Sequence, residues 1–222
     1  MDITTFDTYA ALVEATVALL AEHFCQRADG PHAVMLSGGN TPVPAYAALA
    51  QQGPRASDTA YALFSDERMA LPDSPDSNYG SAAAMLAALG VPDTRVMRVD
   101  TGIPLEAAAQ RYDAELARFL DSGGRITLGL LGLGVDGHTA SLFSLEDVRR
   151  GQDAWAVGVA RRAGLDRVSV TPKLLRNVDR LVFLVAGKEK RTVVARLTKT
   201  PRDVPAGLAV AGADAVAVWV AP

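Results

Sequence analysis

The stretch ITLGLLGLGVDGH, residues 126–138, joins a strongly apolar segment to a glycine-rich turn. Its first half has the composition of a strand buried inside a parallel sheet. Gly132, Gly134 and Gly137 then follow in the spacing G-x-G-x-x-G. Because this spacing after a strand is typical of dinucleotide-binding loops, the stretch indicates an α/β fold and raises the question of a cofactor site.

Strand and helix patterns alternate along the rest of the chain. Short apolar runs predict strands at 32–36, 60–64, 95–99, 126–132, 154–160, 167–170, 180–186 and 215–220. Helical spacing of apolar residues predicts helices near 8–27, 43–51, 77–89, 104–120 and 188–199. This alternation predicts an α/β domain with a mostly parallel sheet covered by helices on both faces.

Four polar motifs each come directly after a predicted strand. Parallel strands end at a common edge of their sheet, and ligands of such sheets bind beyond that edge. We therefore expect one site built from SGGNTP (37–42), SDER (65–68), GVDGH (134–138) and GKEK (187–190).

The glycines of the first motif, Gly38 and Gly39, permit close approach of the backbone and unusual φ angles. Asn40 or Thr41 would cap the helix that follows, with Pro42 as its first residue. Free N–H groups at the positive end of a helix suit a phosphate. A plain strand-to-helix turn explains the pattern equally well, so both interpretations stay open.

Two of the motifs carry cationic side chains. In SDER, the Arg68 guanidinium can bind a phosphate through two hydrogen bonds, and the Asp66 carboxylate can position a hydroxyl or a water. Lys188 in GKEK would supply a second phosphate cation. Each of these groups can also be an ordinary exposed charge.

In SNYG (77–80) a helix cap and a packed tyrosine are favoured, and Asn78 is a weaker site candidate.

Asp136 and His138 in GVDGH help to distinguish between two interpretations of this loop, cofactor binding and catalysis. Asp136 would place a negative charge beside a pyrophosphate, although Arg161 and Arg162 after the next predicted strand could accept a 2′-phosphate. His138 suits proton transfer near neutral pH, and Asp136 can orient its imidazole. The catalytic interpretation is favoured. A capping aspartate beside a surface histidine remains the alternative.

The composition argues against several classes of protein. The formal net charge of −3 indicates no broad attraction to nucleic acid or anionic membranes. The single cysteine, Cys25, excludes an internal disulfide, and no spacing of possible ligands indicates a metal site. His23 and His32 are expected to be structural. No secretory signal or membrane span is predicted, so we expect a cytoplasmic protein.

Six stretches occur in order between residues 36 and 190: LSGGNTP, FSDER, SNYG, LGLGVDGHTASLF, RVSVTPKLL and LVFLVAGKEK. Together they resemble the 6-phosphogluconolactonase family, which is related to the glucosamine-6-phosphate isomerases and deaminases. The resemblance implies one domain over residues 1–222 with a doubly wound, Rossmann-like sheet. It implies hydrolysis of 6-phospho-D-glucono-1,5-lactone to 6-phosphogluconate in the oxidative pentose phosphate pathway, with no metal, nucleotide or other cofactor. We expect the protein to be a monomer or a weak homodimer, and its binding partner to be this small lactone.

The resemblance also suggests a role for each candidate residue. The phosphate and the sugar would be held by Ser37, Gly38, Gly39, Asn40, Thr41, Asp66, Arg68, Asn78, Gly137 and Lys188. Within this set, backbone N–H groups of residues 37–39 and Thr41 would hold the phosphate, with Arg68 and Lys188 as its clamp. His138 would be the general base, oriented by Asp136. The glycine N–H groups around Gly134 to Gly137 are candidates for binding the oxyanion.

Two rival functions and two departures from the family pattern remain. An amino-sugar-phosphate isomerase or deaminase would use Asp66 and Asp136 for proton transfer, but the acid expected soon after Phe143 is missing, and Ser144 follows instead. A sugar-phosphate sensor would need no base. Lactonases commonly have proline at position 144, and their C-terminal tryptophan, here Trp219, is usually followed by aspartate.

Overall fold

Residues 1–150 and 152–222 are described by a computed structural model of the chain. Its centre is a six-stranded sheet in the order β1-β9-β8-β5-β2-β3, and every neighbouring pair of strands in it is parallel. The strands are β1 (Asp2–Thr5), β2 (His32–Leu36), β3 (Ala60–Phe64), β5 (Arg125–Gly132), β8 (Leu181–Ala186) and β9 (Val216–Ala221). The predicted α/β fold with a mostly parallel sheet is confirmed.

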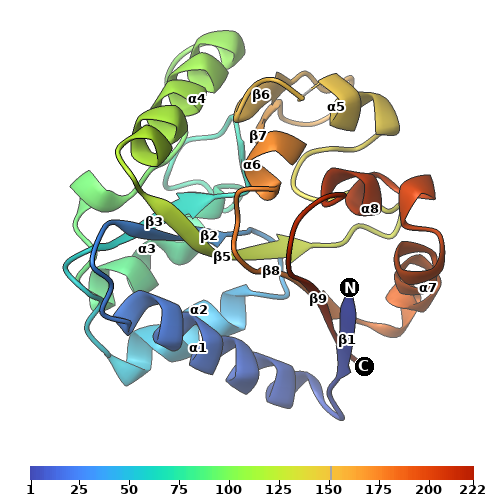
Figure 1. Cartoon of the computed structure of the whole chain (residues 1–222), viewed down its shortest axis with the longest axis horizontal. Coiled ribbons are helices and arrows are strands. Elements are labelled where there is room, and N and C mark those ends of the chain that lie inside the picture. The colour runs from blue at the N-terminus through green and yellow to red at the C-terminus, as the bar shows by residue number, and fades with distance from the viewer. Residues whose placement is uncertain (151) are drawn as a thin grey trace.

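Helices cover both faces of this sheet (Figure 1). One face carries α1 (Tyr9–Cys25), α2 (Val43–Gln52) and α3 (Asn78–Ala88). The other face carries α4 (Leu105–Asp121), α6 (Pro172–Leu175), α7 (Arg191–Lys199) and α8 (Pro205–Ala209), and α5 (Leu145–Arg150) lies beside α8. Short 3₁₀ turns are η1 (Asp93–Arg95), η2 (Lys188–Lys190) and η3 (Pro201–Asp203). The sheet is therefore doubly wound.

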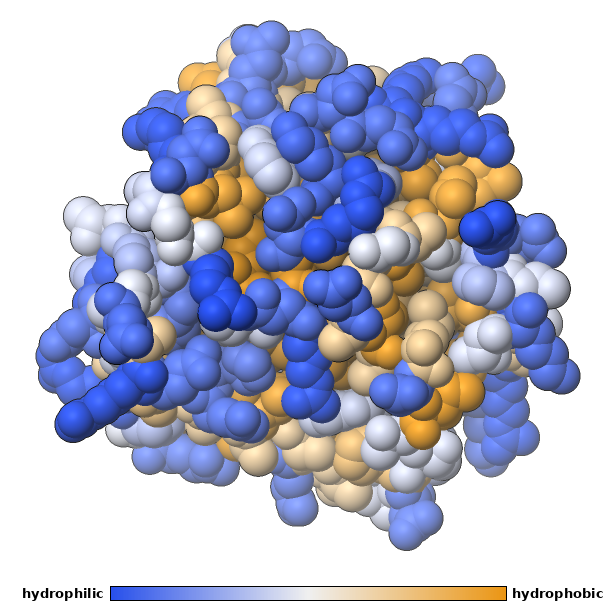
Figure 2. All heavy atoms as spheres, viewed as in Figure 1, coloured by the Kyte–Doolittle hydropathy of each residue, from blue (hydrophilic) through white to orange (hydrophobic). Residues whose placement is uncertain are grey.

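The core consists of two clusters, one on each face of the sheet. Successive strand residues point to opposite faces, so Val34 packs with the α1–α3 cluster and Met35 with the α4 cluster. Phe24 and Tyr112 are among the largest fully buried side chains, one in each cluster. Figure 2 shows a largely polar face, with apolar residues visible between the polar groups near its centre.

The chain reverses direction across the sheet between β2 and β5. From β2 it moves outward to β3, and it later returns to add β5 on the opposite side of β2, followed by β8 and β9. Loops that leave neighbouring strands in opposite directions create a crevice at the carboxyl ends of those strands. The segments after β2 and β5 are therefore positioned to border a ligand site.

Three strand predictions need correction. The segments at 154–160 and 167–170 do not join the large sheet; β6 (Ala156–Val159) and β7 (Arg167–Val170) form a separate antiparallel sheet with β4 (Asp66–Arg68). The predicted strand at 95–99 is reduced to one β-bridge between Val96 and Ala62. The strand β1 was not predicted, because its four residues are all exposed and show no alternation.

None of the helices in the described part of the chain has the length and hydropathy needed to cross a membrane.

Candidate active site

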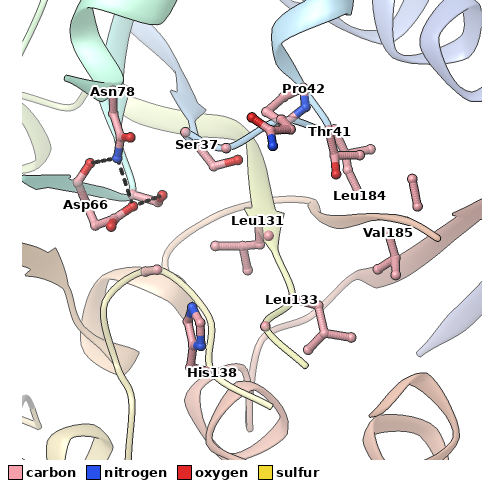
Figure 3. Close-up of a pocket in the computed structure, with 18 of the residues that line it drawn as sticks. Ser37, Thr41, Pro42, Asp66, Asn78, Leu131, Leu133, His138, Leu184 and Val185 are labelled. Carbon is pink, nitrogen blue, oxygen red and sulfur yellow. Dashed lines mark hydrogen bonds between the residues drawn. The ribbon is translucent and has the colours of Figure 1, made fainter. Parts of the chain in front are cut away.

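A cavity of about 390 Å³ lies where the four polar motifs meet (Figure 3). It is lined by nine of the predicted site residues: Ser37, Gly38, Gly39, Asn40, Thr41, Asp66, Arg68, Asn78 and His138. The predicted residues Asp136, Gly137 and Lys188 are not part of its lining. The cavity lies beyond β2 and β5, as the reversal of strand order requires.

The loop at 37–42 differs in detail from its prediction. Pro42 occupies the N-cap position of α2, and neither Asn40 nor Thr41 caps the helix through its side chain. Instead, the carbonyls of these two residues accept hydrogen bonds from the Tyr9 hydroxyl, at 3.2 Å and 3.0 Å. These hydrogen bonds attach the loop to α1. The loop turns at Gly39, which has a φ of 93°, a left-handed conformation that favours glycine.

Among the described residues, one backbone N–H group of this loop is hydrogen-bonded and four are not. The N–H of Ser37 donates to the Tyr46 hydroxyl at 3.2 Å, so it is not available to a phosphate. Within the described chain, the N–H groups of residues 38–41 make no hydrogen bond. Free N–H groups in residues that line a cavity suit an anion.

Three buried polar atoms of the lining residues have no hydrogen-bond partner in the described chain. They are Ser37 Oγ, Arg68 Nε and Asn78 Oδ1. Buried polar atoms are nearly always paired in proteins, so three orphans around one cavity indicate a polar ligand. A different nitrogen of the Arg68 guanidinium, Nη1, donates to the Asp76 carbonyl at 2.7 Å, which holds the side chain at the wall.

His138 and Asp136 form a close pair at the end of the β5 loop. His138 Nδ1 lies 2.6 Å from Asp136 Oδ1, and the His138 backbone N–H donates to the same oxygen at 3.2 Å. A Cβ on Gly134 would overlap the His138 ring and the Asp136 carboxylate, so glycine is needed there. Figure 3 shows the imidazole directed into the space between Asp66 and Leu133.

The protonation of Asp136 determines how the imidazole is held. Burial opposes its ionisation, but hydrogen bonds from the His138 backbone and ring outweigh burial and lower the pKa of Asp136 below its ordinary value. An ionised carboxylate can only accept, so the shared hydrogen lies on Nδ1 of His138. In the tautomer with one ring hydrogen on Nδ1, the lone pair lies on Nε2.

The glycine N–H groups of this loop are already used. Gly134 N donates to the His138 carbonyl at 2.9 Å, and Gly137 N donates to the Gly134 carbonyl at 3.0 Å. The expectation that these two groups bind an oxyanion is therefore wrong. They fold the loop, with Gly137 at a φ of 95°.

Asp66 is the centre of a buried hydrogen-bond network. Its Oδ2 accepts from Ser141 Oγ at 2.6 Å, and its Oδ1 accepts from Ser65 Oγ at 3.1 Å and Asn78 Nδ2 at 3.2 Å. Sequence reasoning did not single out Ser141. Its only signal in the sequence is its place three residues after GVDGH, because its partner lies 75 residues away in the chain.

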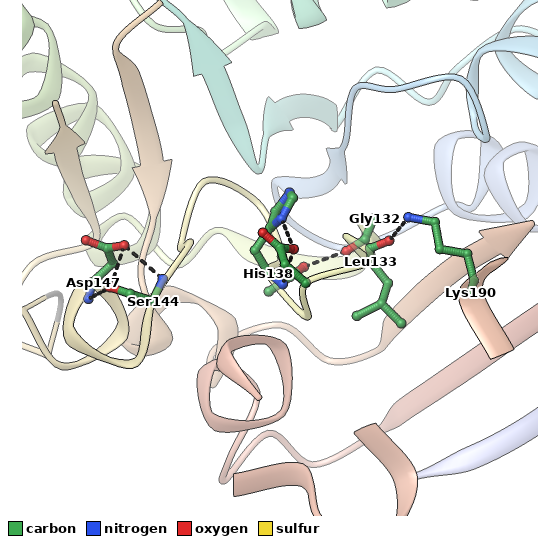
Figure 4. A network of polar contacts seen from close by, with 8 residues as sticks. Gly132, Leu133, His138, Ser144, Asp147 and Lys190 are labelled. Carbon is green, nitrogen blue, oxygen red and sulfur yellow. Dashed lines mark hydrogen bonds and ion pairs between the residues drawn. The ribbon is translucent and has the colours of Figure 1, made fainter. Parts of the chain in front are cut away.

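The lysine at the cavity is Lys190, two residues after the predicted one. Lys188 is exposed and lies outside the lining, while Lys190 lines the cavity and donates from Nζ to the Leu133 carbonyl at 2.6 Å (Figure 4). The cause is local. Gly187 has a φ of 107°, and the 3₁₀ turn η2 that follows directs Lys190 back towards the β5 loop. Both lysines belong to GKEK, and the sequence alone does not separate them.

The structure does not supply the setting that a dinucleotide fingerprint requires. That motif places a helix N-terminus directly after its glycines, against the pyrophosphate. Here residues 133–144 form a loop, and α5 begins only at Leu145. In the described residues, no three His, Cys, Asp or Glu side chains are grouped so that they could hold a metal ion.

The chain belongs to a family of enzymes that act on phosphorylated sugars, the glucosamine-6-phosphate isomerases/6-phosphogluconolactonases, and the family model matches residues 6–219. Among its relatives it is 34% identical over 173 residues to a 6-phosphogluconolactonase of Thermotoga maritima, covering 78% of this chain and 76% of that protein. A 6-phosphogluconolactonase of Synechocystis is 36% identical over 180 residues, covering 78% of this chain and 74% of the relative.

Solved structures agree with this assignment. A crystal structure of a Thermotoga maritima 6-phosphogluconolactonase superposes with a TM-score of 0.77 and 29% sequence identity, covering 99% of this chain and 98% of that one. The superposition extends over nearly the whole chain.

Proposed function

We propose that the chain is a 6-phosphogluconolactonase. It would hydrolyse 6-phospho-D-glucono-1,5-lactone to 6-phospho-D-gluconate, a step of the oxidative pentose phosphate pathway. The observation that carries this proposal is that His138, paired with Asp136, lines a cavity that Arg68, Lys190 and residues 38–41 with their free N–H groups also line. The names of its relatives support the same substrate.

The phosphate of the substrate would bind among Arg68, Lys190 and the N–H groups of residues 38–41. A guanidinium and several N–H groups match the several oxygens of a phosphate. Lys190 keeps two of its three N–H donors after its bond to Leu133. Lys188, which lies outside the lining, takes no part in this proposal. Binding energy from the phosphate would place the lactone carbonyl beside His138.

His138 would act as the general base through Nε2. A water attacks the lactone carbonyl as Nε2 takes one of its protons, and Asp136 stabilises the imidazolium that forms. The C1–O5 bond then breaks, and the imidazolium returns the proton to the ring oxygen. A general base contributes about 10²- to 10⁴-fold in rate. No covalent nucleophile is required, because a lactone is already a reactive ester.

The network around Asp66 favours hydrolysis over isomerisation. An isomerase would need Asp66 free to move a proton at C2, but both of its oxygens accept hydrogen bonds from Ser65, Asn78 and Ser141. Ser144 also occupies a place where the deaminases are expected to carry an acid soon after Phe143. Asp66 is better suited to hold Ser141 and the His138 loop in place.

The proposal is tested with freshly generated 6-phosphogluconolactone. We expect the protein to release acid in a saturable manner, well above the spontaneous hydrolysis of the lactone. Glucosamine 6-phosphate is the matched substrate for the rival activity, and we expect no ammonia from it. Acid release at the spontaneous rate, or ammonia release, would contradict the proposal. A sensor would bind 6-phosphogluconate without accelerating either reaction.

A further inference from the structure

Glu67 lies between two cavity residues but does not reach the cavity itself. In β4, Asp66 and Arg68 line the active-site cavity, whereas Glu67 lines a second cavity of about 500 Å³. This follows from the alternation of side chains along a strand. Glu67 as a whole residue is only 3% exposed, so its carboxylate must be held by protein groups.

Four hydrogen bonds hold the Glu67 carboxylate. Oε1 accepts from the backbone N–H of Arg68 at 2.7 Å and from that of Asn78 at 2.8 Å. Oε2 accepts from the backbone N–H of Tyr79 at 2.8 Å and from Ser77 Oγ at 3.2 Å. Within the described chain, Glu67 forms no ion pair with Lys, Arg or His. Its charge is therefore balanced by these donors and by the positive end of α3.

The same contacts complete the start of α3. The first N–H groups of a helix have no partner within it. Glu67 accepts from the first two, those of Asn78 and Tyr79, and Ser77 Oγ accepts from the third, that of Gly80, at 3.0 Å. The beginning of α3 is thus attached to β4 through one buried side chain.

One oxygen of Glu67 consequently joins two residues of the active site. Oε1 bonds the backbone of both Arg68 and Asn78. Asn78 in turn donates from Nδ2 to the Asp66 carbonyl at 2.7 Å, and its Oδ1 has no partner among the described residues. A shift of this oxygen would move the guanidinium and the amide relative to each other.

We infer that Glu67 is a positioning residue that fixes Arg68 relative to Asn78 and thereby sets the affinity for the phosphorylated substrate. The inference rests on the proposed function. Glu67 has no contact with the reacting atoms, so its loss should affect binding more than chemistry.

The test is the substitution Glu67→Gln, which keeps the length of the side chain but replaces one accepting oxygen by an amide donor. If the amide nitrogen takes the place of Oε2, it would face the donors Tyr79 N–H and Ser77 Oγ. If it takes the place of Oε1, it would face the N–H groups of Arg68 and Asn78. We expect KM for the lactone to rise about tenfold while kcat changes less than about threefold. The dissociation constant of 6-phosphogluconate, measured by calorimetry, should rise by the same factor.

The matched control is Asp113→Asn. Asp113 Oδ1 also accepts two backbone N–H bonds, from Trp155 at 2.6 Å and Ala156 at 3.2 Å, but it lies outside the active-site cavity. We expect this variant to lose stability without a change in KM. In an Arg68→Ala background, Glu67→Gln should lose most of its effect on KM, because its action passes through Arg68.

Three outcomes would overturn the inference. These are an unchanged KM and dissociation constant in Glu67→Gln, an equal rise of KM in Asp113→Asn, or a full effect of Glu67→Gln in the Arg68→Ala background. If Glu67→Gln does not fold, Glu67→Asp serves as the second variant. It keeps the carboxylate on a side chain that is one methylene shorter, and we expect the same rise in KM. If the wild type does not hydrolyse the lactone, the proposed function fails, and the calorimetric comparison still tests the positioning role.

Discussion

Nδ1 of His138 lies 2.6 Å from Oδ1 of Asp136, and that oxygen also accepts the His138 backbone N–H. One carboxylate oxygen therefore fixes both the backbone and the ring of the same histidine. The ring also packs against Phe143, with 4.8 Å between the ring centroids. The position of Nε2 at the cavity is thus set by contacts within a single loop.

Asp136→Asn tests whether the ionised carboxylate is needed. An amide would hold the ring but would not stabilise the imidazolium, and it could favour the other tautomer. We expect kcat to fall about 10²- to 10⁴-fold, with KM changed little. Asp147→Asn is the control, because Asp147 accepts from Ser144 in the neighbouring turn and does not touch His138. A similar loss of kcat in both variants would point to loop folding instead.

Gly134→Ala tests the space that the His138 ring occupies. A Cβ at this position would overlap the imidazole, so the ring must move away from Asp136. We expect kcat to fall about 10²-fold, as for the loss of a positioned base. Gly30→Ala is the matched change, since a Cβ there would meet no atom within 4 Å. Normal kcat in Gly134→Ala would show that the observed ring position is not the active one.

Lys190→Met tests which lysine binds the phosphate. Its ammonium lies at the cavity, whereas that of Lys188 does not, so we expect KM to rise about tenfold in Lys190→Met and to stay unchanged in Lys188→Met. Steady-state kinetics with the phosphorylated lactone measures both. A rise of KM in Lys188→Met without one in Lys190→Met would contradict this and would identify Lys188, the residue predicted from the sequence, as the phosphate ligand.

The histidines at the opposite edge of the sheet predict how stability depends on pH. Burial lowers the pKa of His23 and of His32 below their ordinary value of 6.5. Below about pH 6.5 these two histidines take up protons in the unfolded chain but stay neutral in the folded chain, and this difference favours unfolding. The stability that the two neutral histidines contribute is therefore complete above about pH 6.5 and is lost as the pH falls through their lower folded pKa values. The unfolding temperature should therefore fall less on acidification from about pH 7 to about pH 5.5 in His23→Gln/His32→Gln than in the wild type. Equal slopes would contradict this.

Much of the large sheet could be predicted from local pattern. The predicted strands at 32–36 and 60–64 coincide with β2 and β3, because continuous apolar runs between turn residues identify buried strands. The pairing of strands could not be predicted. The apolar residues of β6 and β7 would suit either sheet, and the choice depends on β4, some 90 to 100 residues earlier in the chain.

The candidate site shows the same division. Motifs that follow strands were predicted to meet, since the carboxyl ends of parallel strands share an edge, and Ser37, Arg68 and His138 do line one cavity. The choice between Lys188 and Lys190 depends on a positive φ at Gly187, which the sequence permits but does not require. Ser141 depends on a contact with Asp66 across the fold.

The central claim is that His138 is the general base of lactone hydrolysis. The most direct test is kcat of His138→Ala on freshly generated 6-phosphogluconolactone, measured beside calorimetric binding of 6-phosphogluconate. We predict that kcat falls about 10²- to 10⁴-fold while 6-phosphogluconate binds with nearly wild-type affinity. A folded His138→Ala protein with near-wild-type kcat would contradict the account.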